Sequence, residues 1–418
     1  MLWNRVEAAE HRKDSQLARE LEIGLPVELS LEQSIALLRD YITRQFVTQG
    51  MIADFSIRRV DPNNPHAHIL LTLRKATASG FGSKAREWNR KTNLLDWRSA
   101  WAERTNQHLA RAGHDARIDH RTLEAQQVEL TPARRIGVGG GRPIGPGLPK
   151  HLEDRIAEQQ KIATQNAETI LEDPTAALRA LTRRQVTFTR QDLANFLQSR
   201  TGPGQLESVL LAIMTSSELV ALRPDGEGEA RFTSRDLLEA EKSLIKRVTA
   251  MATRRGHGGS SQLPASAASP RLPSAEQRRA FEYIVGDGDC KVLAMPAGND
   301  KSAPLAAARE AWEAQGLRVL GAALSSTAVK SLAAESGIES RTLESHEREW
   351  LQGQNPLTPN DVIVIDDSEM IGIKQLERIL AAADKARAKV VLMGDSTQLA
   401  AMGAMSPLHG LIAMAGPR

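Results

Sequence analysis

Two histidines separated by one residue open a run of strand-forming residues, NPHAHILLTLR, at positions 64–74. Side chains alternate between the two faces of a strand, so His66 and His68 share one face. That face continues with Leu70 and Thr72, and the apolar side chains of the other face are expected in a core. Two neighbouring imidazoles can bind one divalent metal ion. The alternative interpretation is an exposed strand start whose histidines are solvated.

A second group of residues that could bind a ligand follows the apolar run CKVLAM in the C-terminal part of the sequence. Lys301 and Ser302 stand where a phosphate-binding loop places its lysine and its hydroxyl, and Gly298 lies in the same loop. The pattern GxxxxGK[ST] also requires glycines where this chain has Met295 and Asp300. The spacing therefore predicts a damaged phosphate loop.

Acidic and amide side chains follow two further apolar strands. Asp366 and Asp367 end the run VIVI, where carboxylates at the carboxyl end of a parallel strand can hold Mg²⁺ and orient water. Gln398 follows KVVLMGD and is suited to sensing a phosphate. The three strand ends in this order predict a nucleotide site on a parallel α/β sheet.

The elements around the histidines form a compact α+β unit. A strand is expected within 17–27, and Ser30 with Gln33 forms a capping-box pattern at the start of a helix. The helix is expected to end at Gly50, and a strand over 51–60 precedes the histidine strand. The sequence therefore predicts an antiparallel hairpin that carries the histidines.

The stretch 74–121 is rich in Lys and Arg and contains tryptophans, Trp88 among them. Basic residues interleaved with aromatic rings suit single-stranded nucleic acid, because bases can stack on the rings. The alternative is an amphipathic helix with a tryptophan core. Helical spacing favours the core interpretation, and Gly113 marks the expected helix end. The residues on the predicted apolar face are Leu94, Trp97, Trp101 and Leu109.

The middle of the chain carries two linkers around a small folded unit. The Gly/Pro-rich segment 134–149 and the segment 254–274 have the composition of linkers. A charged helix is expected from about 149 to 169. Two helices and a hairpin within 186–247 resemble a winged helix, a shape that binds DNA or serves as a spacer.

Composition narrows the class of protein. The 418 residues are 41% hydrophobic and 25% charged, which is ordinary for a globular chain of several domains. One cysteine excludes an internal disulfide framework and a cysteine-based zinc cluster. No apolar run is long enough for a transmembrane helix, and no signal peptide is evident. A cytoplasmic protein without a membrane partner is expected.

The C-terminal block resembles the first RecA-like domain of superfamily 1 DNA helicases of the conjugative type. The stretches PSAEQRRAF, MPAGNDKS, VIVIDDSEM and GDSTQL are similar to its motifs in order. The resemblance implies ATP with Mg²⁺, and Asp367 as the catalytic base of the ATPase, where the family has glutamate. It also implies a set of nucleotide-binding residues, Gln277, Gly298, Lys301, Ser302, Asp366 and Gln398.

The N-terminal part resembles MobA/MobL-type conjugal transfer relaxases of the Ti-plasmid (TraA-like) type, through PHAHILLTLR, ELEIGLP and ARIDHRTLEAQ. The resemblance implies an antiparallel HUH fold and a divalent cation, Mg²⁺ or Mn²⁺, that His66 and His68 help to hold. It also implies a tyrosine that nicks single-stranded DNA at a plasmid transfer origin. Relaxosome and type IV secretion coupling proteins are the implied partners. Glu20 and Glu22 could support the metal, although surface charge is the favoured interpretation.

The sequence departs from these families at both sites. The nucleophilic tyrosine is expected in a segment before the start of this chain, since Tyr41 and Tyr283 occupy a helix and the helicase block. Arg58 stands where the third metal-binding histidine is expected, and motif I lacks two glycines. The second RecA-like domain would follow the last residue of this chain.

Five segments are predicted. They are a relaxase-like α+β domain (1–125), a linker with a charged helix (126–185), a winged-helix-like unit (186–250), a flexible linker (251–271) and an incomplete RecA-like P-loop domain of α/β class (272–418). The leading hypothesis is a conjugal relaxase–helicase, truncated at both ends and inactive or impaired. The alternatives are a non-catalytic single-stranded DNA-binding remnant and a degenerating gene product.

Overall fold

The computed structural model divides the chain into two compact units. One contains residues 1–114, 247–371 and 379–418, and the other contains 115–246 and 372–378. Among the described residues, no helix combines the length and apolar character needed to cross a membrane. The described residues are 2–10, 15–59, 61, 64–77, 80–114, 116–122, 126, 129–131, 150–202, 204–222, 229–257, 274–295 and 301–395.

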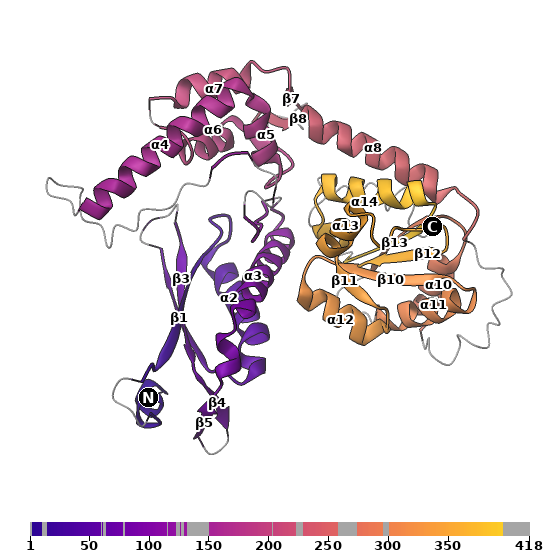
Figure 1. Cartoon of the computed structure of the whole chain (residues 1–418), viewed down its shortest axis with the longest axis horizontal. Helices are drawn as coiled ribbons and strands as arrows, with labels where there is room; N and C mark the ends of the chain where they lie inside the picture. The colour runs from indigo at the N-terminus through magenta and orange to yellow at the C-terminus, as the bar shows by residue number, and fades with distance from the viewer. Residues whose placement is uncertain are drawn as a thin grey trace. The chain divides into compact units, whose positions relative to one another are not determined.

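The N-terminal part is built on a three-stranded antiparallel sheet in the order β1-β3-β2, which confirms the predicted hairpin (Figure 1). Its strands are β1 (Ala18–Gly24), β2 (Ala53–Arg58) and β3 (His66–Thr72). A separate hairpin joins β4 (Arg74–Thr77) to β5 (Gly80–Lys84). The helical elements are α1 (Leu2–Ala8), α2 (Leu31–Gln45), η1 (Val47–Gln49), η2 (Arg86–Asn89) and α3 (Lys91–Arg111).

The start of α2 follows the sequence closely, and its end does not. The Ser30 side chain accepts from the Gln33 amide, and the Gln33 side chain accepts from the Ser30 amide, which confirms the capping box. The α-helix ends at Gln45, earlier than predicted. Gly50, with φ of 94°, ends the short η1 turn instead, because glycine adopts the left-handed conformation without strain.

The core of the N-terminal part lies between one face of the sheet and the helices α2 and α3. Ile69 and Leu71 of β3 are buried there with Trp97 of α3, so the core interpretation of the helical tryptophans is confirmed. Leu94, predicted on the same apolar face, is 44% exposed, which corrects that prediction. Thr72 is also buried, and its hydroxyl is satisfied by a hydrogen bond that it accepts from the Ile52 amide. The opposite face of the sheet, which carries the histidines, is left free of this core.

In the part that the structure describes, the middle of the chain combines helices α4 to α7 with a small sheet in the order β6-β8-β7. The predicted hairpin is confirmed as antiparallel pairing of β7 with β8. Its elements are α4 (Lys150–Glu172), α5 (Pro174–Thr182), β6 (Phe188–Thr189), α6 (Arg190–Gln198), α7 (Leu206–Met214), β7 (Leu219–Ala221) and β8 (Arg231–Ser234). A long helix, α8 (Arg235–Ala252), follows, and the sequence analysis does not predict it. The predicted linker 134–149 lies outside the described residues.

The C-terminal part is a five-stranded parallel sheet in the order β11-β10-β12-β13-β9. Figure 1 shows α10, α11 and α12 on one face and α13 and α14 on the other. The strands are β9 (Cys290–Met295), β10 (Arg318–Ala323), β11 (Ser340–Thr342), β12 (Asp361–Ile365) and β13 (Lys389–Asp395). The helical elements are α10 (Ala275–Val285), α11 (Ser302–Ala314), α12 (Ser326–Ser336), α13 (Leu343–Leu351), η3 (Ser368–Met370) and α14 (Ile373–Ala386).

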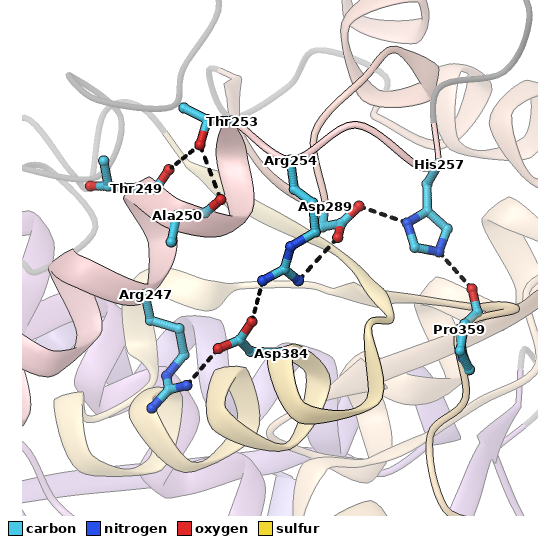
Figure 2. A network of polar contacts seen from close by, with 9 residues as sticks. All are labelled: Arg247, Thr249, Ala250, Thr253, Arg254, His257, Asp289, Pro359 and Asp384. Atoms are coloured by element: carbon cyan, nitrogen blue, oxygen red, sulfur yellow. Dashed lines mark hydrogen bonds and ion pairs between the residues drawn. The ribbon is translucent and has the colours of Figure 1, made fainter.

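An ion-pair network anchors the end of α8 to this sheet (Figure 2). Arg254 donates to Asp289, 1% exposed at the start of β9, at 3.2 Å and to Asp384 of α14 at 2.6 Å. Arg247 also donates to Asp384, and His257 bridges Asp289 and a backbone carbonyl. The anchor lies at the amino ends of the strands, so it leaves the carboxyl ends free for chemistry.

Replacing Arg254 by Met should lower the free energy of unfolding by about 2–3 kcal/mol, because the buried carboxylate of Asp289 loses its guanidinium. Cys290 is the reporter: burial raises the pKa of its thiol to about 12, so it reacts with a thiol reagent only after the sheet opens. Arg255→Met, one residue away at an exposed position, is the matched control. Equal labelling rates in the two variants would contradict the anchoring role.

Candidate metal centre and nucleotide site

The pairing register of the three strands determines which side chains are neighbours on the histidine face of the sheet. His68 lies between Glu22 of β1 and Ser56 of β2, while His66 lies between Gly24 and Arg58. The structure therefore brings the two predicted histidines together, with ring centroids 5.4 Å apart. Arg58, at the position where a third histidine was expected, is next to them and exposed.

Each imidazole uses its Nδ1 atom in a hydrogen bond. His66 Nδ1 lies 3.0 Å from the carbonyl oxygen of Asn64, and His68 Nδ1 lies 2.6 Å from Oε1 of Glu20. Because both partners are acceptors, Nδ1 carries the proton and Nε2 presents its lone pair. The Nε2 atom of His68 is buried and has no hydrogen-bond partner among the described residues. A buried acceptor without a donor is the state expected of a metal-binding imidazole.

A carboxylate completes a group of three potential metal ligands. Atoms of Glu22, His66 and His68 lie within 4.8 Å of one another. The residues present therefore fit a divalent cation, which binds imidazole nitrogen and carboxylate oxygen together. Sequence reasoning favoured surface charge for Glu22, because pairing between strands that are distant in the sequence is not visible in a local pattern. The alternation of Glu20 and Glu22 in a predicted strand was the available signal.

Neither tyrosine of the sequence presents its hydroxyl for chemistry. The Tyr41 hydroxyl is buried and donates to the carbonyl oxygen of Trp97 at 3.1 Å, and burial raises its pKa above the usual range. The Tyr283 oxygen accepts a hydrogen bond from the Val292 amide, and burial raises its pKa to about 12. Both hydroxyls therefore serve the packing of their own domains.

Four of the predicted nucleotide-site residues meet at the carboxyl ends of the parallel strands. They line one cavity of about 100 Å³, together with side chains of α11 and α12. Lys301 and Ser302 come from the start of α11, and Asp366 and Asp367 follow β12. A lysine, a hydroxyl and two carboxylates around one cavity are the groups that bind a phosphate with its Mg²⁺.

The two aspartates are held in an unusual conformation. Asp367 has φ of 48°, in the left-handed region that non-glycine residues rarely adopt. Its amide donates to Oδ1 of Asp366 at 3.0 Å. Burial and the charge of Asp367 raise the pKa of Asp366 to about 6, while Lys301 opposes the shift. Burial also raises the pKa of Asp367. A cation held nearby would lower the pKa of both carboxyls and favour their ionised forms.

Glu369 is a buried carboxylate that sequence reasoning missed. Its Oε1 atom accepts from the Asp395 amide at 3.2 Å, which links η3 to β13, and its Oε2 atom is buried without a partner among the described residues. Burial and repulsion by Asp367 raise its pKa to about 8. The carboxyl is therefore neutral at pH 7. A polar residue just beyond a motif is an ordinary surface pattern, so no signal marked it.

Of the remaining predicted residues, some have other structural contacts and some lie outside the described residues. Gln277 uses its amide oxygen to accept from the Ser274 amide in the capping box of α10. Met295 is the buried last residue of β9 and packs in the core. Gly298 and Gln398 lie outside the described residues, as does Asp300.

Comparison with known proteins finds family matches for the two ends of the chain. Residues 1–142 match the MobA/MobL family, and residues 273–418 match the AAA domain. A probable conjugal transfer protein TraA of Sinorhizobium fredii is 35% identical over 95% of this chain and 39% of its own length. The conjugal transfer protein TraA of Agrobacterium fabrum is 34% identical over 98% of this chain and 40% of its own length. The chain thus spans about two fifths of the length of these relatives.

Among solved structures, a chain described under "Molecular Basis of Vancomycin Resistance Transfer in Staphylococcus aureus" is 36% identical in sequence. The match covers 29% of this chain and 66% of that chain, with a TM-score of 0.28.

Replacing Glu369 by Gln should change how stability depends on pH. The folded pKa of about 8 lies above the unfolded value of 4.5, so its contribution is fully present below pH 4.5. That contribution is lost as pH rises through about 8, and the variant, with no proton to lose, should not show this loss. Denaturant unfolding between about pH 5 and about pH 9, in EDTA, measures the difference; Glu282→Gln, at an exposed site on α10, is the control. Parallel pH profiles for wild type and Glu369→Gln would contradict the assignment.

Proposed function

Because the chain joins a MobA/MobL relaxase domain to an AAA domain and is homologous to TraA conjugal transfer proteins over most of its length, we propose a role in handling plasmid DNA during conjugation. The N-terminal part binds single-stranded DNA at a transfer origin through a divalent cation. The observation that carries this proposal is the pair of imidazoles on the open face of the sheet, with Nε2 of His68 buried and unpartnered among the described residues.

The N-terminal site binds the phosphate backbone with its own residues as well as through the metal. His66 and His68 hold Mg²⁺ or Mn²⁺, which when bound polarises a phosphoryl oxygen. Arg58 lies on the same face as His66 and makes no hydrogen bond or ion pair among the described residues. A guanidinium beside the metal ligands offers two parallel donors to a phosphate.

The second candidate function is DNA binding without cleavage. Strand transfer by transesterification requires a hydroxyl that can attack phosphorus. The hydroxyl of Tyr41 is buried and that of the half-buried Tyr283 accepts a backbone hydrogen bond, so we propose that neither supplies that nucleophile. Cleavage therefore depends on a nucleophile other than these two tyrosines, whereas binding does not.

The C-terminal part, which we interpret as RecA-like, is a nucleotide site with impaired turnover. Lys301, Ser302 and Asp366 would bind ATP with Mg²⁺, and Asp367 would act as the base, shorter by one methylene than the family's glutamate. Met295 replaces a glycine and is committed to the core, so the loop loses the close backbone approach that glycine allows. Adenine contacts by Gln277, Gly298 near the phosphates and a sensing role for Gln398 belong to the same proposal.

The fold of the middle part and the partner proteins complete the proposal. The order α5, β6, α6, α7, β7, β8 favours a winged-helix-like unit, which lies between the two sites in the sequence. Other relaxosome proteins and a type IV secretion coupling protein are the proposed partners.

Single-stranded DNA binding should be metal-dependent and salt-sensitive. A fluorescent oligonucleotide should bind the full chain more tightly with Mn²⁺ than with EDTA, and the affinity should fall steeply as salt rises, because phosphate contacts release counterions. The double variant His66→Ala/His68→Ala should lose the Mn²⁺-dependent part and keep the salt-sensitive part. Absence of binding at low salt would remove the proposal.

ATP hydrolysis by the full chain should be unmeasurable with or without DNA. The expectation follows from the loss of glycine at position 295 and the short base at position 367. Phosphate release measured against a Lys301→Ala variant distinguishes real turnover from contamination, because the variant lacks the phosphate-binding lysine. Turnover that disappears in Lys301→Ala would show a working site.

A further inference from the structure

The proposed metal centre has only two histidine ligands among the described residues. Two histidines alone leave a divalent cation with few protein ligands, and sites of this kind use at least three. The strand position opposite His66 on β2 holds Arg58, whose positive charge repels a cation. Among the described residues, the third group within reach is a carboxylate on the other neighbouring strand, β1.

We infer that Glu22 is the third metal ligand and that it replaces the imidazole missing at Arg58. Glu22 is the cross-strand partner of His68, and its carboxylate lies within 4.8 Å of the ligand atoms of both histidines. Its side chain is exposed and makes no hydrogen bond or ion pair among the described residues. It can therefore rotate into the coordination shell. The inference deepens the proposed function of the same site and rests on it for the presence of a cation.

Glu20 acts through His68 as a positioning residue. Its Oε1 atom lies 2.6 Å from His68 Nδ1, on the side of the ring opposite Nε2. A carboxylate at this place fixes the tautomer and the orientation of the ring, and it strengthens the imidazole as a ligand. The two glutamates of β1 thus have different tasks, because their side chains, two residues apart, stand on one face at successive positions.

The ligand set has a consequence for the metal and for the phosphate. Two nitrogens and one carboxylate oxygen favour a harder ion such as Mn²⁺ more than three imidazoles do. Gly24, beside His66, has no side chain, and a Cβ built there would meet nothing within 4 Å. The side of His66 toward β1 is therefore open for a phosphate, with Arg58 on its other side.

Mn²⁺ binding to the full chain, followed by electron paramagnetic resonance without DNA, tests the assignment. Glu22→Ala should weaken binding by about 10–100-fold or more, on the scale of losses at metal sites. Glu28→Ala, at an exposed glutamate outside the sheet, is the control and should bind as wild type. Glu20→Ala should weaken binding, whereas Glu20→Gln should retain most of it because an amide oxygen still accepts from Nδ1.

A rescue variant separates a lost ligand from a damaged sheet. In Glu22→Ala/Arg58→His the imidazole returns to β2, and Mn²⁺ affinity should recover. Wild-type affinity in Glu22→Ala overturns the inference, and so does a loss that Arg58→His fails to restore. If Mn²⁺ binds through Glu22 but no oligonucleotide binds, the proposed function fails while the ligand assignment stands. If DNA binding depends on Mn²⁺ but is unchanged in Glu22→Ala, the ligand assignment fails while the proposed function stands.

Discussion

The register of β3 between its two antiparallel neighbours is the constraint on which the N-terminal site depends. Pairing of His68 with Glu22, and of His66 with Arg58, decides which groups surround the proposed metal position. A shift of one residue would turn both imidazoles into the core and bring Ile69 out to the surface. The packing of Ile69 and its apolar neighbours against α2 and α3 therefore stabilises the ligand geometry, although none of these residues touches the site.

Electrostatics plays the corresponding role at the C-terminal site. The half-buried Asp366 and Asp367 lie near the buried Glu369, and desolvation together with repulsion by neighbouring carboxylates raises the pKa of each. Lys301 is the cation that opposes this shift for all three. Because the raised pKa of about 8 keeps Glu369 mostly protonated at pH 7, it can link η3 to β13 without adding a third full charge beside the aspartates. The left-handed backbone at Asp367 is strain of the kind that persists only where the surroundings hold it.

The sequence predicted what local patterns encode. Alternation gave the histidine face, the capping box gave the start of α2, and strand ends gave Lys301 and Asp366 in one cavity. Long-range consequences were not predictable in the same way. The closeness of Glu22 to the histidines depends on strand pairing, and the burial of Glu369 depends on the contact between η3 and β13. Leu94 fitted the helical period but faces outward, because the period fixes relative positions and not the width of the buried stripe.

The two departures from family patterns have different physical outcomes. Arg58 removes an imidazole from the metal face, but the neighbouring strand already places a carboxylate within reach, and the arginine itself can meet a phosphate. Met295 removes a glycine from the nucleotide loop and uses the position for core packing, where no neighbouring group can restore a close backbone approach. A lost metal ligand can be replaced by any nearby donor, whereas a lost glycine cannot be replaced from elsewhere. This difference is the physical basis for proposing metal binding in the N-terminal part and impaired turnover in the C-terminal part.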